Sequence, residues 1–307
     1  MKRRTAGNDV AGSLRPIRRV LVPTDFSPSS DCALERAVLI AGSGHGNIDL
    51  LHVGRARLQS AERQKARRNL ERAVLLAREF GGKAGAPVVR LSAGIRTGEP
   101  HVEIIRRARE INAEIVVMGR GRPGGLVRSM LGTTSARVVR MSDVATLVVG
   151  RRPRAPYRRP LIAIETDPSV RSLIELTRRV VHGAEGRVRL VHAYQVPFEE
   201  YHLVAGDASS RWYFHQSRKS AEASVRKLLV SIGLDPAAMK CALRRGDPRQ
   251  AILAEAARIH ADLLVLGTHG RGGVAHALLG SIAERVVAST KRDVLVARPV
   301  RFTFVPP

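Results

Sequence analysis

The sequence predicts two similar α/β domains in tandem, each built around a doubly wound sheet of five parallel strands. Three observations predict this fold class. The length of 307 residues suits about two domains, most of the chain is covered by an internal repeat, and short apolar runs alternate with amphipathic segments of helical period in each half. Runs such as IVVM and LLVL suit strands buried on both faces of a parallel sheet, whose helical crossovers wind right-handedly.

The internal repeat is the strongest of these signals. Residues 119–149 align without a gap to residues 267–297, a shift of 148, with ten identities in thirty-one positions. Upstream the shift is 140, so that residues 20–25 lie over residues 160–165. The second half has therefore gained about eight residues, which we place within 194–215.

The expected strands and helices of the first half alternate strictly. The strands lie near residues 18–24, 47–53, 88–92, 114–118 and 145–149. The helices between them lie near residues 29–42, 58–80, 99–111 and 133–141. Leu70, Val74 and Ala77 recur at helical spacing and give the second of these helices an apolar face.

The second half follows the same order. Its expected strands lie near residues 160–164, 187–193, 239–243, 262–266 and 293–297. Its expected helices lie near residues 168–182, 216–233, 248–259 and 281–289. Residues 194–214 hold much of the aromatic content, including the only tryptophan. A lid over a site, a dimer contact and a surface flap packed on its own domain all stay open for this stretch.

The domain boundaries follow from the alternation of strands and helices. We predict a disordered basic tail at 1–14, a first domain at 15–150, a linker at 151–159, a second domain at 160–300 and a tail at 301–307. The linker is rich in proline and arginine, which suits a connecting segment. The first domain is called repeat 1 below, and the second is called repeat 2.

Composition and charge exclude several classes of protein. No apolar run approaches the ~20 residues of a membrane helix, and the basic N-terminus lacks the apolar stretch of a signal peptide. Cys32 and Cys241 lie in different halves and cannot form a disulfide framework, so we expect a cytoplasmic protein. The net charge of +25 should attract polyanions. Aromatic residues are not interleaved with the arginine clusters, which disfavours a stacking platform for single-stranded nucleic acid.

A glycine-rich loop in repeat 2 carries the clearest functional signal. Its fourth strand ends at Gly267, and the pattern Gly267-x2-Gly270-x9-Gly280-Ser281 leads into a helix. Ligands of open parallel sheets bind at this edge. Glycines let backbone amides approach an anion closely, and the helix N-terminus favours negative charge. Arg271 adds a nearby cation. No Gly-Lys-Ser/Thr follows, so this is not a Walker A loop.

This spacing resembles the nucleotide-binding signature of the universal stress protein (UspA) family. The resemblance covers nearly the whole chain, including the Pro-x-Asp that ends the first strand and the Gly-Asp-Pro before the third helix of repeat 2. It implies a Rossmann-like fold of the adenine nucleotide alpha hydrolase-like kind, made twice and joined as a pseudo-dimer through the last strands. It also implies ATP with Mg²⁺ as the ligand. Adenine and ribose would lie near the end of the first strand, and the phosphates would lie in the glycine loop.

The two repeats depart from the family pattern in complementary ways. Repeat 1 has the expected acid, Asp25, and keeps Gly132-Thr133, but Arg122 stands where the second glycine belongs. Arginine in a left-handed conformation costs roughly 1–2 kcal/mol. Repeat 2 keeps all three glycines and Ser281, but Glu165 replaces the acid. A single hydrogen bond to a charged group contributes about 1.5–3 kcal/mol, which is less than several loop amides together.

We therefore predict that repeat 2 binds ATP and that repeat 1 binds it weakly or not at all. The alternative, that both loops merely connect strand to helix, stays open. In repeat 2 the resemblance implies contacts from Ile164, Glu165, Leu266, Gly267, His269, Gly270, Arg271, Gly272, Gly280, Ser281 and Ile282. In repeat 1 the corresponding residues are Asp25, Met118, Gly119, Gly132 and Thr133. Met118 and Leu266 could equally be core residues, and Asp167 could act in place of Glu165.

The functional expectation is a regulatory ATP ligand in the stress response, a role that only the resemblance supplies. No general base is evident, so we do not predict an efficient enzyme, although slow hydrolysis stays open. His52 and His192 occupy equivalent positions, and we interpret them as structural rather than catalytic; no metal ligands are assigned. Two alternatives remain, a nucleotide-free interaction scaffold and a polyanion or nucleic-acid binder that uses the arginine-rich surface. A homodimer also stays open.

Overall fold

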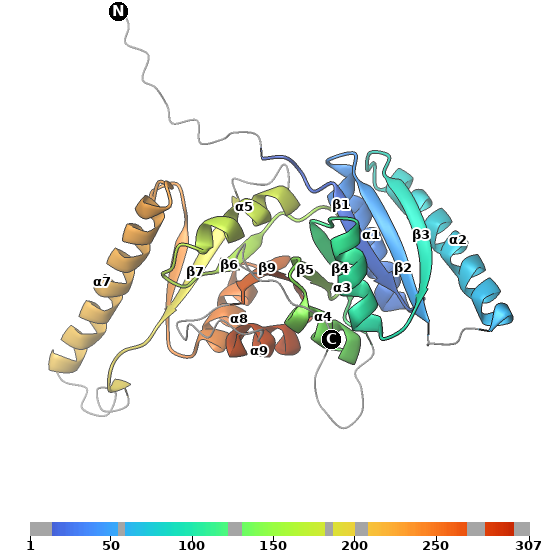
Figure 1. The fold of residues 1–307 in the computed structure, drawn as a ribbon. Coiled ribbons are helices and arrows are strands. Elements are labelled where there is room, and N and C mark those ends of the chain that lie inside the picture. The colour runs from blue at the N-terminus through green and yellow to red at the C-terminus, as the bar shows by residue number, and fades with distance from the viewer. Residues whose placement is uncertain are drawn as a thin grey trace, which may run out of the picture.

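The computed structural model describes residues 14–54, 59–121, 131–181, 187–199, 208–268 and 280–297 (Figure 1). The strands of repeat 1 are β1 (Arg19–Thr24), β2 (Asn47–Gly54), β3 (Arg90–Thr97), β4 (Ile115–Gly119) and β5 (Thr146–Val149). Its helices are α1 (Pro28–Gly42), α2 (Ser60–Lys83), α3 (Pro100–Glu110) and α4 (Thr133–Met141). Strand and helix alternate in this repeat, as the sequence predicts.

Repeat 2 has the same order of elements. Its strands are β6 (Pro160–Ala163), β7 (Arg189–Tyr194), β8 (Cys241–Arg245), β9 (Leu263–Gly267) and β10 (Asp293–Ala297). Its helices are α5 (Val170–Val180), α7 (Ala208–Ser231), α8 (Pro248–Arg258) and α9 (Ser281–Ser289).

All ten strands form one sheet, in the order β3-β2-β1-β4-β5-β10-β9-β6-β7-β8. Every pairing within a repeat is parallel. In both repeats the order reverses beside the first strand, which lies between the second and the fourth. This doubly wound topology places a crevice at the carboxyl ends of the first and fourth strands. The predicted fold class is confirmed.

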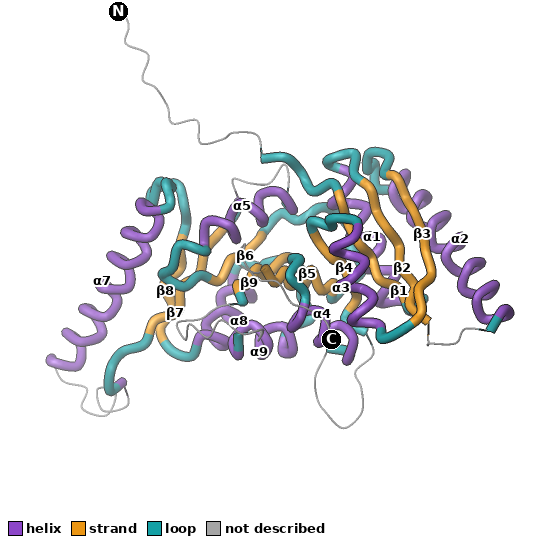
Figure 2. The backbone as a smooth tube through the Cα atoms, viewed as in Figure 1, coloured by secondary structure: helices purple, strands orange, loops and turns teal. Residues whose placement is uncertain are grey.

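Helices cover both faces of the sheet (Figure 2). Apolar side chains of α1, α2, α5 and α7 form one continuous core on the first face, shared by the two repeats. Those of α3, α4, α8 and α9 form the core on the opposite face. Successive residues of a strand enter opposite cores, as Leu263 and Leu264 do. The helices α2 and α7 lie at the two ends of the molecule, beside the edge strands β3 and β8 (Figure 1).

The two repeats meet through β5 and β10, the only antiparallel pair among the described strands. Leu295 pairs with Leu147, its own equivalent at the shift of 148. Because equivalent residues face each other, the repeats are related by a local two-fold axis at this pair. The pairing covers the edge strand of each repeat, which would otherwise present unpaired backbone groups. The implied pseudo-dimer is therefore present.

Two predicted element boundaries were wrong. The sequence placed the third strand near 88–92, but β3 runs over Arg90–Thr97 and pairs along its length with β2. This strand lies at the sheet edge and is half exposed, so it lacks an apolar pattern that could mark its end. The second error concerns α7, which begins at Ala208 rather than near residue 216. Part of the aromatic stretch is therefore helical.

Candidate functional site

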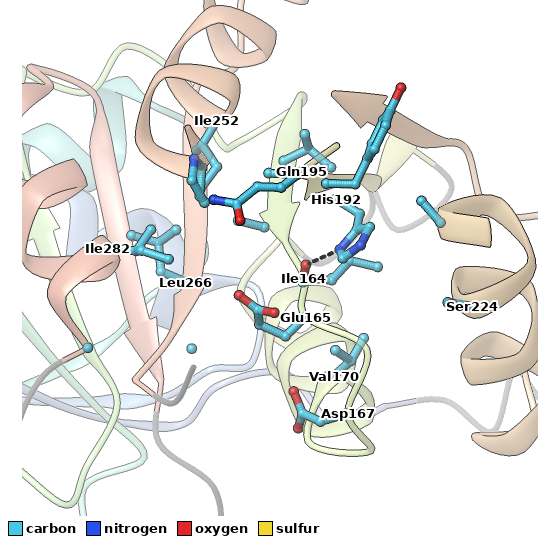
Figure 3. A pocket seen from close by; sticks show the side chains of 18 of the residues that line it. Ile164, Glu165, Asp167, Val170, His192, Gln195, Ser224, Ile252, Leu266 and Ile282 are labelled. Atoms are coloured by element: carbon cyan, nitrogen blue, oxygen red, sulfur yellow. Dashed lines mark hydrogen bonds between the residues drawn. The ribbon is translucent and has the colours of Figure 1, made fainter. Parts of the chain in front are cut away.

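A cavity of about 1280 Å³ lies in repeat 2, at the carboxyl ends of β6, β7 and β9 (Figure 3). This is the edge that the doubly wound topology marks for a ligand. Small-molecule sites usually measure about 300–1,000 Å³, so the cavity has room for a ligand of nucleotide size. The strand ends, the N-terminus of α9 and α7 supply most of its lining, and residues of α4, α5 and α8 complete it.

The strand ends supply an apolar floor and one carboxylate. Ile164 and Leu266 are buried, with exposed fractions of 4% and 3%, and their side chains line the cavity. Glu165 projects from the end of β6 towards Leu266 (Figure 3). His192 donates a hydrogen bond from Nδ1 to the Ile164 carbonyl oxygen at 3.0 Å, which holds this strand end in place.

The same histidine contact occurs in repeat 1. His52 donates from Nδ1 to the Thr24 carbonyl oxygen at 2.9 Å. The two histidines therefore fix equivalent strand ends, and this agrees with the structural role predicted for them.

The N-terminus of α9 forms a second side of the cavity. Gly280 precedes the helix, and its amide donates to the Thr268 carbonyl oxygen at 3.0 Å. A Cβ atom at Gly280 would lie only 2.9 Å from that oxygen, so a side chain does not fit without a shift. No side chain caps this helix end, and the positive end of its dipole reaches the cavity beside Ser281 and Ile282.

The third side of the cavity is α7. Its lining residues are aromatic or carry small polar groups, namely Trp212, Tyr213, Gln216, Ser217, Ser220, Ala221 and Ser224. The Trp212 and Tyr213 rings lie edge to face, with centroids 5.1 Å apart. Sequence reasoning missed this helical wall because it treated the aromatic stretch as a flap or lid. Residues 200–207 of that stretch lie outside the described residues.

Most of the predicted site residues of repeat 2 are brought together. The cavity is lined by Ile164, Glu165, Leu266, Gly267, Gly280, Ser281 and Ile282. The remaining predicted residues, His269, Gly270, Arg271 and Gly272, lie outside the described residues, as does Arg122 of repeat 1. Asp167 also lines the cavity, and its Oδ1 accepts a hydrogen bond from the Ser169 amide at 2.9 Å.

In repeat 1 the acid at the strand end is held by its own turn. Asp25 Oδ1 accepts hydrogen bonds from the Ser27 amide at 3.1 Å and from Ser27 Oγ at 2.5 Å. Partial desolvation opposes ionisation, but the hydrogen bonds from Ser27 and Ser30 outweigh it and lower the pKa of Asp25. The neighbouring Phe26 has a positive φ of 62°, and its ring centroid lies 4.5 Å from that of His52.

Among the described residues, the strand end in repeat 1 is also more crowded than in repeat 2. A Cβ atom at Gly119 would lie 2.4 Å from the Ser29 carbonyl oxygen, whereas the described atom that one at Gly267 would meet is Leu173 Cδ1, at 3.4 Å. The Gly121 amide donates to Ser29 Oγ at 3.3 Å and closes the start of the loop against α1. The equivalent of Gly121 in repeat 2, His269, lies outside the described residues.

The other predicted residues of repeat 1 have structural contacts. Met118 is buried in the core beneath α3 and α4. The Gly132 amide donates to the Arg120 carbonyl oxygen at 2.6 Å, and Thr133 begins α4. We therefore assign Met118 to the core, which was one of its two predicted roles.

Arg120 has a role that the sequence did not reveal. Its side chain is buried and crosses into repeat 2, where Nη1 donates to the Val287 carbonyl oxygen at 2.8 Å and Nη2 to that of Arg292 at 2.9 Å. Thr268 occupies the equivalent position in repeat 2. The hydrogen bonds of Arg120 therefore link the two repeats.

Other reactive groups give no second candidate within the described residues. Cys32 and Cys241 are free thiols, and burial raises the pKa of Cys241 to about 12, which keeps it protonated. The described part of the chain holds no group of three or more His, Cys, Asp or Glu residues placed to bind a metal. Its helices include none with the length and apolar character to cross a membrane.

The fold and the cavity define a class of protein, a tandem pair of doubly wound α/β domains with a cavity at the switch point of the second. Comparison of sequences then gives the family. The model of the universal stress protein family matches residues 16–150 and 156–298, and the chain belongs to this family.

Known proteins similar to this chain include one curated relative and two solved structures. A universal stress protein of Mycolicibacterium smegmatis is 25% identical over 298 residues, which cover 91% of this chain and 97% of the relative. A functionally unknown protein, PA1789 of Pseudomonas aeruginosa, matches with a TM-score of 0.65 at 21% identity, covering 94% of both chains. A universal stress protein of Archaeoglobus fulgidus matches with a TM-score of 0.64 at 22% identity, covering 91% of this chain and 98% of that one. The predicted family and fold are confirmed.

Proposed function

We propose that this protein binds ATP in the cavity of repeat 2 as a regulatory ligand in the stress response, and that repeat 1 has little or no affinity for it. The observation that carries the proposal is the convergence of predicted residues from β6, β9 and α9 on one cavity. Membership of the universal stress protein family supports the stress role.

Each part of the cavity suits one part of the nucleotide. Ile164 and Leu266 offer apolar surface to the adenine ring. The Glu165 carboxylate can accept hydrogen bonds from the ribose hydroxyls. The N-terminus of α9, where Gly280 leaves no room for a side chain, suits the phosphates. Mg²⁺ would be coordinated mainly by the phosphate oxygens of the nucleotide, because this ion is usually held by substrate oxygens and few protein ligands.

The crowded strand end of repeat 1 supports the preference for repeat 2. Gly119 lies directly against Ser29, and Asp25 already accepts two hydrogen bonds from Ser27. A ribose would have to displace those bonds and open the contact.

The arginine-rich surface keeps polyanion binding as the second candidate function. Many arginines within the described residues already have carboxylate partners. Examples are Arg107 with Asp49 at 2.7 Å, Arg109 with Asp143 at 2.8 Å and Arg171 with Glu175 at 2.9 Å. The net charge of +25 is the excess over all acidic residues, so these ion pairs leave it in place.

Calorimetry should show one ATP bound per chain. We expect Glu165→Ala to weaken ATP binding roughly ten- to a hundredfold, because a hydrogen bond to a charged group contributes about 1.5–3 kcal/mol. The matched control is Asp25→Ala, the equivalent change in repeat 1, which should leave the affinity unchanged. Two ATP molecules per chain would contradict the preference for repeat 2. A loss of affinity on Asp25→Ala alone would reverse the assignment of the repeats. No heat of binding would favour the nucleotide-free scaffold.

Fluorescence of Trp212 should report the same binding event. Trp212 is the only tryptophan of the chain, lines the cavity and is 55% exposed. A ligand in the cavity should exclude water from the indole and move its emission to shorter wavelength. The titration midpoint should equal the calorimetric one. An unchanged spectrum at saturating ATP would show that the ligand lies away from α7.

A further inference from the structure

One residue that lines the repeat 2 cavity comes from repeat 1. Arg140, near the end of α4, lines the cavity together with Gly280, Ser281 and Glu284 of the first turn of α9. Its Nη2 lies 2.5 Å from Glu284 Oε1, in an ion pair between the repeats. Both side chains keep about half of their surface exposed, 45% for Arg140 and 49% for Glu284. The guanidinium is thus at the phosphate end of the site and is not buried in a core.

The local two-fold axis shows that this feature is specific to one site. At the shift of 148, the equivalent of Arg140 is Ala288, and the equivalent of Glu284 is Ala136. The reverse contact, from α9 towards the first turn of α4, therefore has no charged side chain on either side. Among the described residues, this pair of equivalent positions therefore supplies a cation from repeat 1 to the cavity of repeat 2 and none in the reverse direction.

The charges around the helix end explain what this cation can do. The Glu284 carboxylate lies in the first turn of α9, where the helix dipole favours negative charge. The same carboxylate would repel a phosphate that approaches this helix end. Arg140 neutralises Glu284, and its planar fork of donors matches a phosphate as well as it matches a carboxylate.

We propose that Arg140 is a ligand-binding residue supplied by repeat 1, which contacts the terminal phosphates of a nucleotide held in repeat 2. This inference rests on the proposed function. It makes the ligand class more specific, because a cation beyond the helix end favours nucleotides with two or three phosphates over monophosphates. It also gives repeat 1 a role in binding although its own strand end is crowded.

The test is calorimetry of ATP, ADP and AMP with the full chain and its variants. Arg140→Ala should weaken ATP binding about five- to tenfold at low salt, a modest effect because the interaction is partly exposed and screened. AMP binding should weaken less than about twofold, because AMP lacks the terminal phosphates that Arg140 would contact. Arg140→Lys should retain part of the affinity. Glu284→Gln should strengthen ATP binding, because it removes the competing carboxylate.

The matched control is Arg137→Ala. Arg137 lies one turn earlier on α4, is 58% exposed and pairs with Glu99 of its own repeat at 3.7 Å. This change should leave all three affinities as they are. Equal ATP affinity in wild type and Arg140→Ala would overturn the inference while the proposed function stands. Equal losses for ATP and AMP would also overturn it, because they would indicate a structural effect. Absence of ATP binding in the wild type would instead remove the proposed function.

Discussion

Replacing Asp293 with alanine is expected to lower the free energy of unfolding by about 3–5 kcal/mol, because the change leaves a buried charge without its partner. Asp293 is the first residue of β10 and is 4% exposed. Its Oδ2 lies 3.3 Å from Nε of the buried Arg36 and accepts a hydrogen bond from the Tyr157 hydroxyl at 2.5 Å. Its Oδ1 accepts from the Gly150 amide at 2.8 Å.

This network joins three parts of the chain. Arg36 comes from α1 of repeat 1, Tyr157 from the linker and Asp293 from repeat 2, with the guanidinium 3.9 Å from the centre of the Tyr157 ring. Burial, and then the nearby Asp293 charge, raise the pKa of Tyr157 well above its usual value, so the hydroxyl remains a donor. Loss of Asp293 should therefore loosen the association of the repeats.

Urea denaturation of Asp293→Ala and Tyr157→Phe measures the effect. Tyr157→Phe removes one hydroxyl and keeps Arg36 paired, so it should cost about 1–2 kcal/mol. If Asp293→Ala costs no more than Tyr157→Phe, the Arg36 pair contributes little to stability and the interpretation is wrong.

Replacing Gly270 with arginine should abolish ATP binding, with a loss of affinity above about a hundredfold. The change places in repeat 2 the residue that repeat 1 has at the equivalent position, Arg122. Gly270 lies outside the described residues, so this prediction rests on the glycine pattern alone. Arginine there costs about 1–2 kcal/mol if the backbone is left-handed, and its side chain keeps the phosphates from loop amides that contribute about 1.5–3 kcal/mol each.

Two measurements check this prediction. Calorimetry should show no heat with ATP, and the stabilisation that ATP gives the wild type against thermal unfolding should disappear. Arg122→Gly is the reciprocal control, and it restores the glycine pattern of repeat 1. We expect one ATP per chain in this variant too, because Gly119 still packs against Ser29. Wild-type affinity in Gly270→Arg would show that the loop does not hold the phosphates.

Part of the candidate site could be predicted because it depends on local patterns and on one topological rule. Apolar runs mark the buried strands, and the glycine pattern follows one of them directly. The doubly wound order then places β6 beside β9, as their pairing of Ile162 with Val265 confirms. Glu165 and Gly267 must therefore lie at the same edge, even though a hundred residues separate them.

Other features could not be predicted, since their partners lie far away in the sequence and have no pattern of their own. Arg120 directly follows Gly119 in the sequence, which suggests an exposed loop residue, yet its guanidinium donates hydrogen bonds to carbonyl oxygens of the other repeat. Nothing in the sequence distinguishes Arg140 from the other arginines, and only the contact between α4 and α9 shows that it lines the cavity. Trp212 gains its position only because α7 begins earlier than its apolar pattern indicates.

Residue order alone was enough to predict the family, the two repeats and the sheet edge at which the cavity lies. These are properties of residue order and periodicity, which fix secondary structure and parallel pairing locally. Packing in three dimensions showed a cavity in repeat 2 and the side chains that cross from one repeat to the other. Such contacts depend on the pairing of β5 with β10, whose two-fold arrangement brings different residues of the two repeats together. Two domains of the same fold therefore make different contacts across their shared interface.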